Sequence, residues 1–534
     1  MKNFHYPFLL FLLLILQDCA SSLKLEAVPK KPEVQKEAIH QMASNATYAL
    51  KGFKYRFPTP IEGVDYNPEW QQLALNFKDA KNKRPHYGIY NIEKDQLNWM
   101  NKGDYSLSMI KKDVTLIRKR DKGILLETEN GLPIRPVDRA DFVLVDDSIA
   151  LKIGERVERV DLRTGEIYWK RPRFQTFDGW LTDEIYGDWM YIMANGLHGF
   201  NLATGEGWFK KANTNYDATL GGRVPLNGAL FGFNFINPFE QDAAFLSPLG
   251  PIIAHNIYAK PVVEQDNLYF ADRLRIYSID RKTGDTHWQQ KIKQQTGISE
   301  ITFLTDQKLL FLGKGYRFVN YLMDKEKTAI VLLMNARNGR VINHINLPEG
   351  EIIVNHAISD TYIYLLSEHA IYQYDYRLSL INHITLPENF GTPLRVVTWS
   401  SAEYDKNLQT GIPDFPLVIR TMKGVIGLYP VSLDKLWYQH LGTINEKEPT
   451  ILSIFSWQIP IFMQEQDLRR SWVDEETEIF WFAKSKKIIG LDLLNNGAKV
   501  AEFDMPSDDF WYVDDGKLVQ FGDQEVQILH LEAN

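Results

Sequence analysis

Two histidines stand at matching places in a duplicated stretch and are the first candidates for metal chemistry. Residues 342–349 read INHINLPE and residues 381–388 read INHITLPE, identical at seven of eight positions and offset by 39 residues. His344 and His383 are therefore equivalent, and two imidazoles on the same side of neighbouring repeats could share a metal ion. Duplication of a structural unit explains the pair without any ligand, and we favour that interpretation.

Two acidic stretches could supply oxygen ligands for calcium. One is DEETE at residues 474–478, and the other consists of Asp508, Asp509, Asp514 and Asp515. Neither has the ligand spacing of an EF-hand loop. Solvated turns between strands explain both, so we predict no metal site.

Motifs for other catalytic chemistry are missing from the sequence. It has no HExxH pair, no nucleophile elbow and no phosphate-binding loop, which leaves a hydrolase without its usual nucleophile or metal ligands. The formal net charge of -8 gives no basic footprint for nucleic acid. We therefore expect a protein that is not an enzyme and does not bind nucleic acid.

The only cysteine, Cys19, follows a segment that predicts export. Lys2 provides a positive charge, and residues 7–16 form an uninterrupted apolar run directly before the cysteine region. This resembles a bacterial lipoprotein signal, in which the cysteine is lipidated, although Asp18 stands where such signals carry a small residue. Residues 1–19 are thus predicted to be the signal peptide; the alternative is an ordinary secretory signal cleaved near residues 20–22.

Later parts of the chain must fold without a disulfide, because no second cysteine exists. Residues 20–84 begin with a Lys-, Glu- and Pro-rich stretch that is typical of a tether, with a short helix expected around residues 34–42. Hydrophobic residues make up 44% of the chain, enough for a large core. We assign that core to residues 85–534.

A turn followed by tryptophan recurs along this region and reveals its architecture. Short alternating strands lead to a Thr-Gly turn and then to a tryptophan in RVDLRTGEIYW, GFNLATGEGW and YSIDRKTGDTHW. The spacing between the turn glycines is 40 residues and then 79, close to two periods. A period of about 40 residues with several strands is typical of a β-propeller blade. The residues predicted to build this repeat are Gly165, Trp169, Gly205, Trp208, Gly284, Trp288 and Trp437.

The number of such turns predicts the number of blades. Eight turns of this kind occur, near residues 131, 165, 205, 284, 339, 378, 434 and 497, with spare strands at both ends of the repeat region. Propellers commonly close with one blade built from both termini, which removes a free sheet edge. We therefore predict an all-β propeller of about eight four-stranded blades, with seven or nine as alternatives.

The repeat resembles that of the PQQ-binding-like (pyrroloquinoline quinone) β-propeller family. The resemblance covers residues 85–531 and implies that the tryptophans pack between neighbouring blades, with Trp99 in the same role in the closing blade. It also implies a choice between quinoprotein dehydrogenases and non-catalytic propellers. The enzymes typically carry a vicinal cysteine pair against the cofactor, which a chain with one cysteine cannot form. We therefore expect no cofactor.

One stretch departs from the repeat. Residues 209–259 lie between two repeat turns and contain the aromatic residues Phe231, Phe233, Phe235 and Phe239. They form either a degenerate blade whose phenylalanines are its core, which we favour, or a loop on one rim that presents apolar surface to a partner.

These observations and the resemblance together suggest a function. We expect an exported, lipid-anchored, non-catalytic scaffold that binds other proteins in the periplasm, at the outer membrane or at the cell surface. Non-catalytic members of the family include lipoproteins of outer-membrane assembly, so assembly components are the partners that the resemblance implies, with membrane contact through the lipid anchor alone. Two alternatives stay open: a PQQ-dependent quinoprotein oxidoreductase that holds PQQ and calcium, and a carbohydrate or peptide binder.

Overall fold

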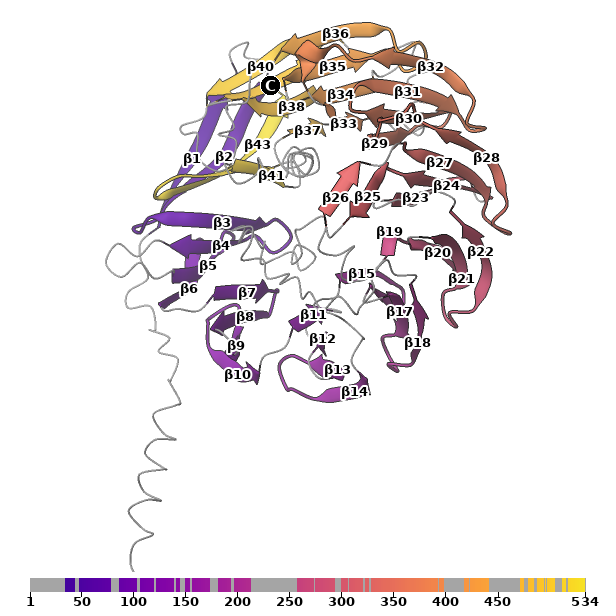
Figure 1. Cartoon of the computed structure of the whole chain (residues 1–534). Coiled ribbons are helices and arrows are strands. Elements are labelled where there is room, and N and C mark those ends of the chain that lie inside the picture. The colour runs from indigo at the N-terminus through magenta and orange to yellow at the C-terminus, as the bar shows by residue number, and fades with distance from the viewer. Residues whose placement is uncertain are drawn as a thin grey trace, which may run out of the picture.

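Strands form almost all of the described chain and assemble into a ring of ten blades (Figure 1). The computed structural model describes residues 34–533 except 44–47, 78–85, 103–105, 120–121, 139–140, 145–148, 154–155, 173–180, 194–195, 213–256, 273, 293–298, 306, 320–321, 326–327, 392, 398–416, 422, 441–470, 475–478, 485–486, 494, 496, 505–510 and 515–516.

Nine blades are four-stranded antiparallel sheets, numbered here in chain order. Blades 1–3 are β3 (Ile61–Asn67), β4 (Gln72–Phe77), β5 (His86–Asn91), β6 (Gln96–Lys102); β7 (Ser106–Ile110), β8 (Val114–Lys119), β9 (Lys122–Glu127), β10 (Pro133–Asp138); and β11 (Asp141–Leu144), β12 (Ile149–Ile153), β13 (Arg156–Asp161), β14 (Ile167–Pro172). Blades 4 and 5 are β15 (Leu181–Tyr186), β16 (Trp189–Met193), β17 (Gly196–Asn201), β18 (Gly207–Lys211); and β19 (Ile257–Glu264), β20 (Asn267–Asp272), β21 (Arg275–Asp280), β22 (Thr286–Lys291).

The second half of the ring continues the pattern. Blades 6 and 7 are β23 (Ser299–Thr305), β24 (Lys308–Gly313), β27 (Ile330–Asn335), β28 (Val341–Asn346); and β29 (Ile353–Ile358), β30 (Tyr362–Ser367), β31 (Ala370–Asp375), β32 (Leu380–Thr385). Blades 8 and 9 are β33 (Pro393–Val397), β34 (Leu417–Thr421), β35 (Gly424–Leu428), β36 (Lys435–His440); and β37 (Ser471–Asp474), β38 (Ile479–Lys484), β39 (Lys487–Asp492), β40 (Ala498–Asp504). A hairpin, β25 (Tyr316–Val319) and β26 (Leu322–Lys325), is inserted in blade 6, and the 3-10 turn η4 (Glu388–Phe390) links blades 7 and 8.

Blade 10 is built from both ends of the chain. Its strands β41 (Trp511–Asp514), β42 (Lys517–Phe521) and β43 (Glu525–Ala533) are followed in the sheet by β2 (Tyr48–Arg56) and then β1 (Gln35–Met42). The β2–β43 ladder runs without interruption from the pair Tyr48 and Ala533 to the pair Arg56 and Glu525. Closure by both termini, as predicted, removes the free edges that an open ring would leave.

The core consists of ten apolar clusters, each formed by two neighbouring blades. Blade 10, for example, packs on blade 9 through Leu50 and Trp481 and on blade 1 through Tyr55 and Tyr90. A single blade has two faces and can bury neither by itself, so the stability of each blade depends on both neighbours. Ten interfaces for ten blades close the ring.

The repeated turn joins the third and fourth strands of a blade, as in blade 5. The Asp280 carboxylate accepts hydrogen bonds from the backbone N–H groups of Lys282 and Thr283, each at 2.8 Å. Gly284 follows with φ +75°, a left-handed conformation that side chains disfavour. Gly284, one of the residues predicted from the sequence to build the repeat, lies in this turn.

The predicted number of eight blades is too low. All eight predicted turns exist, one in each of blades 2–9. The strands expected to share the closing blade instead belong to two different blades: β5 and β6 to blade 1, and β42 and β43 to blade 10. Neither blade 1 nor blade 10 has a Thr-Gly turn, and this is why counting such turns missed them.

The ring also begins earlier than residue 85. Four strands, β1–β4, lie within residues 35–77, which the sequence analysis placed in the tether and N-terminal lead-in ahead of the propeller. The helix expected around residues 34–42 is strand β1. Residues 1–33, including Cys19, lie outside the described residues, as do Phe231, Phe233, Phe235 and Phe239. Within the described ranges, no helix is long and apolar enough to cross a membrane.

Candidate functional site

Tryptophans of the repeat lie at the seams between blades. Trp288 of blade 5 is 8% exposed, and its Nε1 donates a hydrogen bond of 2.8 Å to the carbonyl oxygen of Ala336 in blade 6. Its ring covers Gly339, the turn glycine of blade 6, so closely that a Cβ there would collide with it. A tryptophan and the glycine it covers therefore come from adjacent repeats.

The same contact recurs around the ring. Trp169 covers Gly205, Trp208 covers Gly284, and Trp437 covers Gly497. Trp99, which belongs to blade 1 and not to the closing blade, covers Gly131 in blade 2. These side chains are occupied by packing between blades, so they are not available for a ligand.

Other residues replace tryptophan at three seams. Arg135 of blade 2 donates from Nε to the carbonyl oxygen of Leu162 at 2.9 Å, and its guanidinium lies over Gly165. Asn343 of blade 6 donates from Nδ2 to the carbonyl oxygen of Arg377 at 2.6 Å, and Asn382 of blade 7 bonds the carbonyl oxygen of Ser432. The sequence analysis missed these three residues because they share a position in the repeat but not a residue type.

A small ion cluster crosses the inner side of the seam between blades 6 and 7. Glu300 of β23 pairs with Lys314 of its own blade and, at 3.0 Å, with His356 Nδ1 of β29 in the next blade. Burial raises the pKa of the Glu300 carboxyl, but the Lys314 charge and the His356 hydrogen bond outweigh it and hold that pKa well below its usual range. Its partners occupy the carboxylate, which favours a structural role.

The two histidines considered for metal binding lie on the outer strands of neighbouring blades. His344 and His383 take equivalent places on the outer strands β28 and β32, where His383 stacks on Tyr372 at 5.8 Å between ring centroids. No group of three His, Cys, Asp or Glu side chains suited to a metal occurs among the described residues. Of the acidic residues considered for calcium, residues 475–478, Asp508, Asp509 and Asp515 lie outside the described residues.

The irregular stretch lies between blades 4 and 5 in the sequence. Blades 4 and 5, which flank it in the sequence, pack directly on each other through Tyr191, Phe270 and their neighbours. Trp208 Nε1 also donates across this seam to the carbonyl oxygen of Arg281 at 3.1 Å. The predicted degenerate blade falls in this stretch, of which residues 213–256 lie outside the described residues.

Exposed apolar side chains gather on the outer rim of blades 6–8. These residues, here called the rim patch, are 45–52% exposed: Ile342, Leu380, Ile381, Tyr429 and Val431. The hydrogen bond from Asn382 to Ser432 brings the outer strand of blade 7 beside the turn of blade 8. Ile381 and Val431 are each adjacent in sequence to one of these partners.

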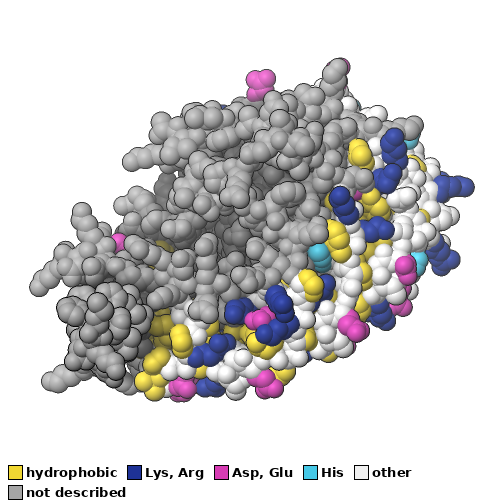
Figure 2. Space-filling model, turned by 60° about the horizontal axis from the view of Figure 1, so that its bottom comes forward, with side chains coloured by type: hydrophobic (Ala, Val, Ile, Leu, Met, Phe, Trp, Pro, Cys, Tyr) yellow, Lys and Arg dark blue, Asp and Glu magenta, His cyan; other side chains and the backbone are white. Residues whose placement is uncertain are grey.

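Elsewhere the outer surface is mixed. Figure 2 shows Lys, Arg, Asp and Glu side chains interspersed with apolar ones along the edge of the ring that faces the viewer. Ile167 and Tyr168 on β14 and Phe209 on β18 are also exposed, with Lys170 and Lys211 beside them on the same strands. No surface of a single charge sign covers the edge drawn there.

Comparison with known proteins identifies the repeat. Residues 249–377 match the family model described as outer membrane protein assembly factor BamB. This part of the chain carries BamB-like PQQ repeats, within an all-β propeller. The matched residues span blades 5 and 6 and the first three strands of blade 7, which include Gly284 and Trp288. The predicted repeat family is confirmed.

Solved structures show only distant likeness. BamB from Moraxella catarrhalis is 11% identical with a TM-score of 0.31, covering 74% of this chain and 98% of that one. Apo AztD from Citrobacter koseri is 9% identical with a TM-score of 0.31, covering 69% and 94%. The computationally designed Ika8 protein is 9% identical with a TM-score of 0.30, covering 72% and 97%. No curated protein matches the sequence.

Proposed function

We propose that this protein is an exported, lipid-anchored, non-catalytic propeller that binds other proteins at the periplasmic face of the outer membrane. The observation that carries the proposal is the rim patch, since exposed apolar groups on a rigid scaffold favour a protein interface. The signal ending near Cys19 supports export and anchoring. The name of the matched family model, an outer membrane protein assembly factor, supports assembly components as partners.

A charge placed in the rim patch tests the scaffold role. Ile381→Asp and Val431→Asp each put a carboxylate at an exposed position, so the fold should persist while an apolar interface is disrupted. Ile167→Asp on β14 is the matched control, because that residue is also an exposed apolar side chain of the outer surface. Partners are captured from solubilised membranes and then rebound as purified proteins to each variant.

We expect a purified partner to bind the unmodified protein and the Ile167→Asp control, and to bind the two patch variants about tenfold more weakly or worse. Equal binding to all four proteins would remove the rim patch as the interface. Failure of every purified partner to bind would remove the scaffold role itself.

Anchoring and the absence of catalysis need separate tests. Cys19→Ser should move the protein from the membrane fraction to the soluble exported fraction, and mass spectrometry should find acyl chains on the unmodified protein alone. Purified protein supplied with PQQ and Ca²⁺ should not reduce a redox dye with alcohols or sugars. Clear dye reduction would replace the scaffold proposal with a quinoprotein oxidoreductase.

A further inference from the structure

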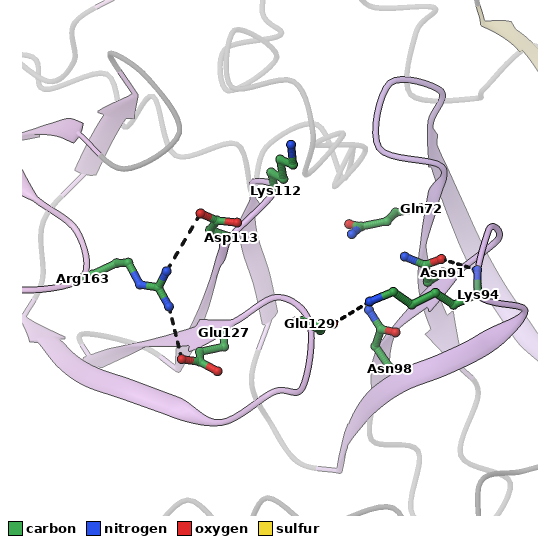
Figure 3. A pocket seen from close by; sticks show the side chains of 9 residues that line it. All are labelled: Gln72, Asn91, Lys94, Asn98, Lys112, Asp113, Glu127, Glu129 and Arg163. Atoms are coloured by element: carbon green, nitrogen blue, oxygen red, sulfur yellow. Dashed lines mark hydrogen bonds and ion pairs between the residues drawn. The ribbon is translucent and has the colours of Figure 1, made fainter.

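A polar pocket of about 260 Å³ lies where the turns of blades 1, 2 and 3 meet (Figure 3). It is far in the sequence from the residues that match the family model and from the rim patch. All of its lining residues are polar or charged: Gln72, Asn91, Lys94, Asn98, Lys112, Asp113, Glu127, Glu129 and Arg163. Blade 1 supplies the amides, and blades 2 and 3 supply most of the charges.

The charges of the pocket largely neutralise one another. Lys94 Nζ lies 2.5 Å from a Glu129 carboxylate oxygen, and Arg163 lies 3.2 Å from Glu127 and 3.9 Å from Asp113. With Lys112, the lining has three cations and three carboxylates. A strongly charged ligand would therefore meet repulsion as well as attraction.

On the blade 1 side of the pocket, two side-chain amide oxygens accept no hydrogen bond from the described residues. Gln72 is 6% exposed, and its Oε1 accepts no hydrogen bond from any described residue. The Oδ1 of Asn98 is likewise buried and without a donor among those residues, whereas the Oδ1 of Asn91 accepts from the Lys94 backbone N–H at 2.7 Å. Figure 3 shows the Gln72 amide directed into the space between the blades. A buried acceptor left unmatched lowers stability.

The fold does not require an amide at this position. Gln72 pairs in register with Asn91, the first residue of the blade 1 turn. At the corresponding place in the ladder, blade 2 has Val114 and blade 3 has Ile149. Blade 2 thus buries an apolar side chain where blade 1 buries Gln72, and blade 3 has an apolar residue there that is partly buried. An amide kept there without a hydrogen-bond partner for its oxygen among the described residues indicates a ligand.

We propose that this pocket binds a small uncharged polyhydroxylated molecule, such as a neutral monosaccharide. Its hydroxyl groups donate to Gln72 Oε1 and Asn98 Oδ1, and they accept hydrogen bonds from the lysines. A hydroxyl group can make both kinds of hydrogen bond, because it is a donor and an acceptor at once. This proposal does not depend on the scaffold role, since it concerns the opposite part of the ring.

A second pocket resembles a sugar site more closely in its composition, but its geometry does not fit one. It lies between blades 4 and 5 and includes Trp189 and Trp208. Sugars commonly bind by stacking on an open aromatic face, and Trp208 is covered by Gly199 on its own blade and by Gly284 on the next. The pocket at the turns of blades 1, 2 and 3 is therefore preferred.

Saturation-transfer NMR and calorimetry with defined probes test the proposal on the full exported chain. The probes are D-glucose, D-galactose, N-acetyl-D-glucosamine and glycerol, with inorganic phosphate as a charged comparison. Gln72→Val places the residue type of Val114 at this position, so the blade should fold; if it does not, Gln72→Leu replaces it. Gln520→Leu is the matched control, because Gln520 is also a buried strand glutamine, in blade 10.

We expect at least one neutral probe to bind the unmodified protein and the Gln520→Leu control with similar affinity. Loss of one hydrogen bond should weaken binding to Gln72→Val by about tenfold, while its thermal unfolding midpoint stays unchanged or rises. The proposal is overturned if no neutral probe binds, if Gln72→Val binds as tightly as the unmodified protein, or if phosphate binds more tightly than every neutral probe.

Discussion

Two sets of seams hold the ring together by different means. Between blades 5 and 6, the large Trp288 ring fills the interface and covers a glycine at positive φ. Between blades 6 and 7, the short Asn343 makes the corresponding hydrogen bond, and the turn residue is Leu378 at φ +61°. At both seams, a side-chain donor forms a hydrogen bond with a turn carbonyl of the next blade. The size of the side chain that carries the donor determines how much apolar packing accompanies this hydrogen bond.

Removal of a tryptophan should cause the largest loss. Trp288→Ala deletes a buried ring and the hydrogen bond to Ala336, so we expect the free energy of unfolding to fall by about 3–5 kcal/mol. Urea denaturation followed by tryptophan fluorescence and circular dichroism measures the loss. Trp288→Phe keeps most of the ring and should lose far less; an equal loss would assign the effect to the hydrogen bond instead.

Substitution of the turn glycine should come next. In Gly284→Ala, the new Cβ would lie 2.6 Å from the Trp208 ring, and φ would remain at +75°. Together these should lower the free energy of unfolding by about 1–3 kcal/mol. Gly350→Ala is the control, because Gly350 has φ +88° but nothing within 4 Å of its added Cβ. The control should show the smaller loss, due to the backbone conformation alone.

The asparagine seams should be less sensitive. Asn343→Ala removes one hydrogen bond at an exposed position and opens no core cavity, so we expect a loss of about 1 kcal/mol. The same denaturation experiment applies, with His344→Ala as the neighbouring control that breaks no contact between blades. If Asn343→Ala cost as much as Trp288→Ala, the two kinds of seam would not differ as we infer.

The smallest change in the free energy of unfolding should come from the Glu300 ion cluster at the seam between blades 6 and 7, and it should depend on pH. The pKa of Glu300 is lowered in the folded protein from 4.5, so its ion pairs stabilise above that value, and the contribution declines as pH falls toward the folded pKa. Lys314→Met should therefore reduce stability by about 1 kcal/mol or less near pH 7, and by a smaller amount near pH 3.5.

A matched control exists for this pH dependence. Lys170→Met removes an exposed lysine that pairs with Glu158 within blade 3 at 3.1 Å, and it should change stability little at either pH. If Lys314→Met had the same effect at both pH values, the Glu300 cluster would not act through charge.

The sequence predicted the repeat well where local chemistry defines it. The Asp-x-x-Thr-Gly turn forms its own hydrogen bonds, so Asp280 and Gly284 reveal it without help from distant residues. Blade 1 uses Asn91 and, at φ +51°, Asp95 instead of the Thr-Gly pair. Packing against neighbouring blades can hold a turn in place even when its residues differ from the Thr-Gly pattern. A sequence pattern based on glycine does not detect such turns.

The strands near the N-terminus were hidden for a different reason. β1 is an outer fifth strand with most of its side chains exposed, so QKEAIHQM lacks an apolar face. In β3, the register shifts between Ile61 and Gly63, which interrupts the alternation that marks a strand. The pocket could not be predicted at all, because Gln72, Asn98 and Arg163 meet only when three blades pack.

The strand pairing that closes blade 10 affects the rate of folding. β2 pairs with β43, so the residues joined by its ladder are separated by nearly the whole chain, from Tyr48 to Ala533. Loop closure over such a distance is slow, and contacts of this order delay folding. β43 is synthesised long after β2 and completes the sheet that β2 began. The ring can therefore close only after β43 has been made, and a chain that stops short of β43 leaves β2 without this partner.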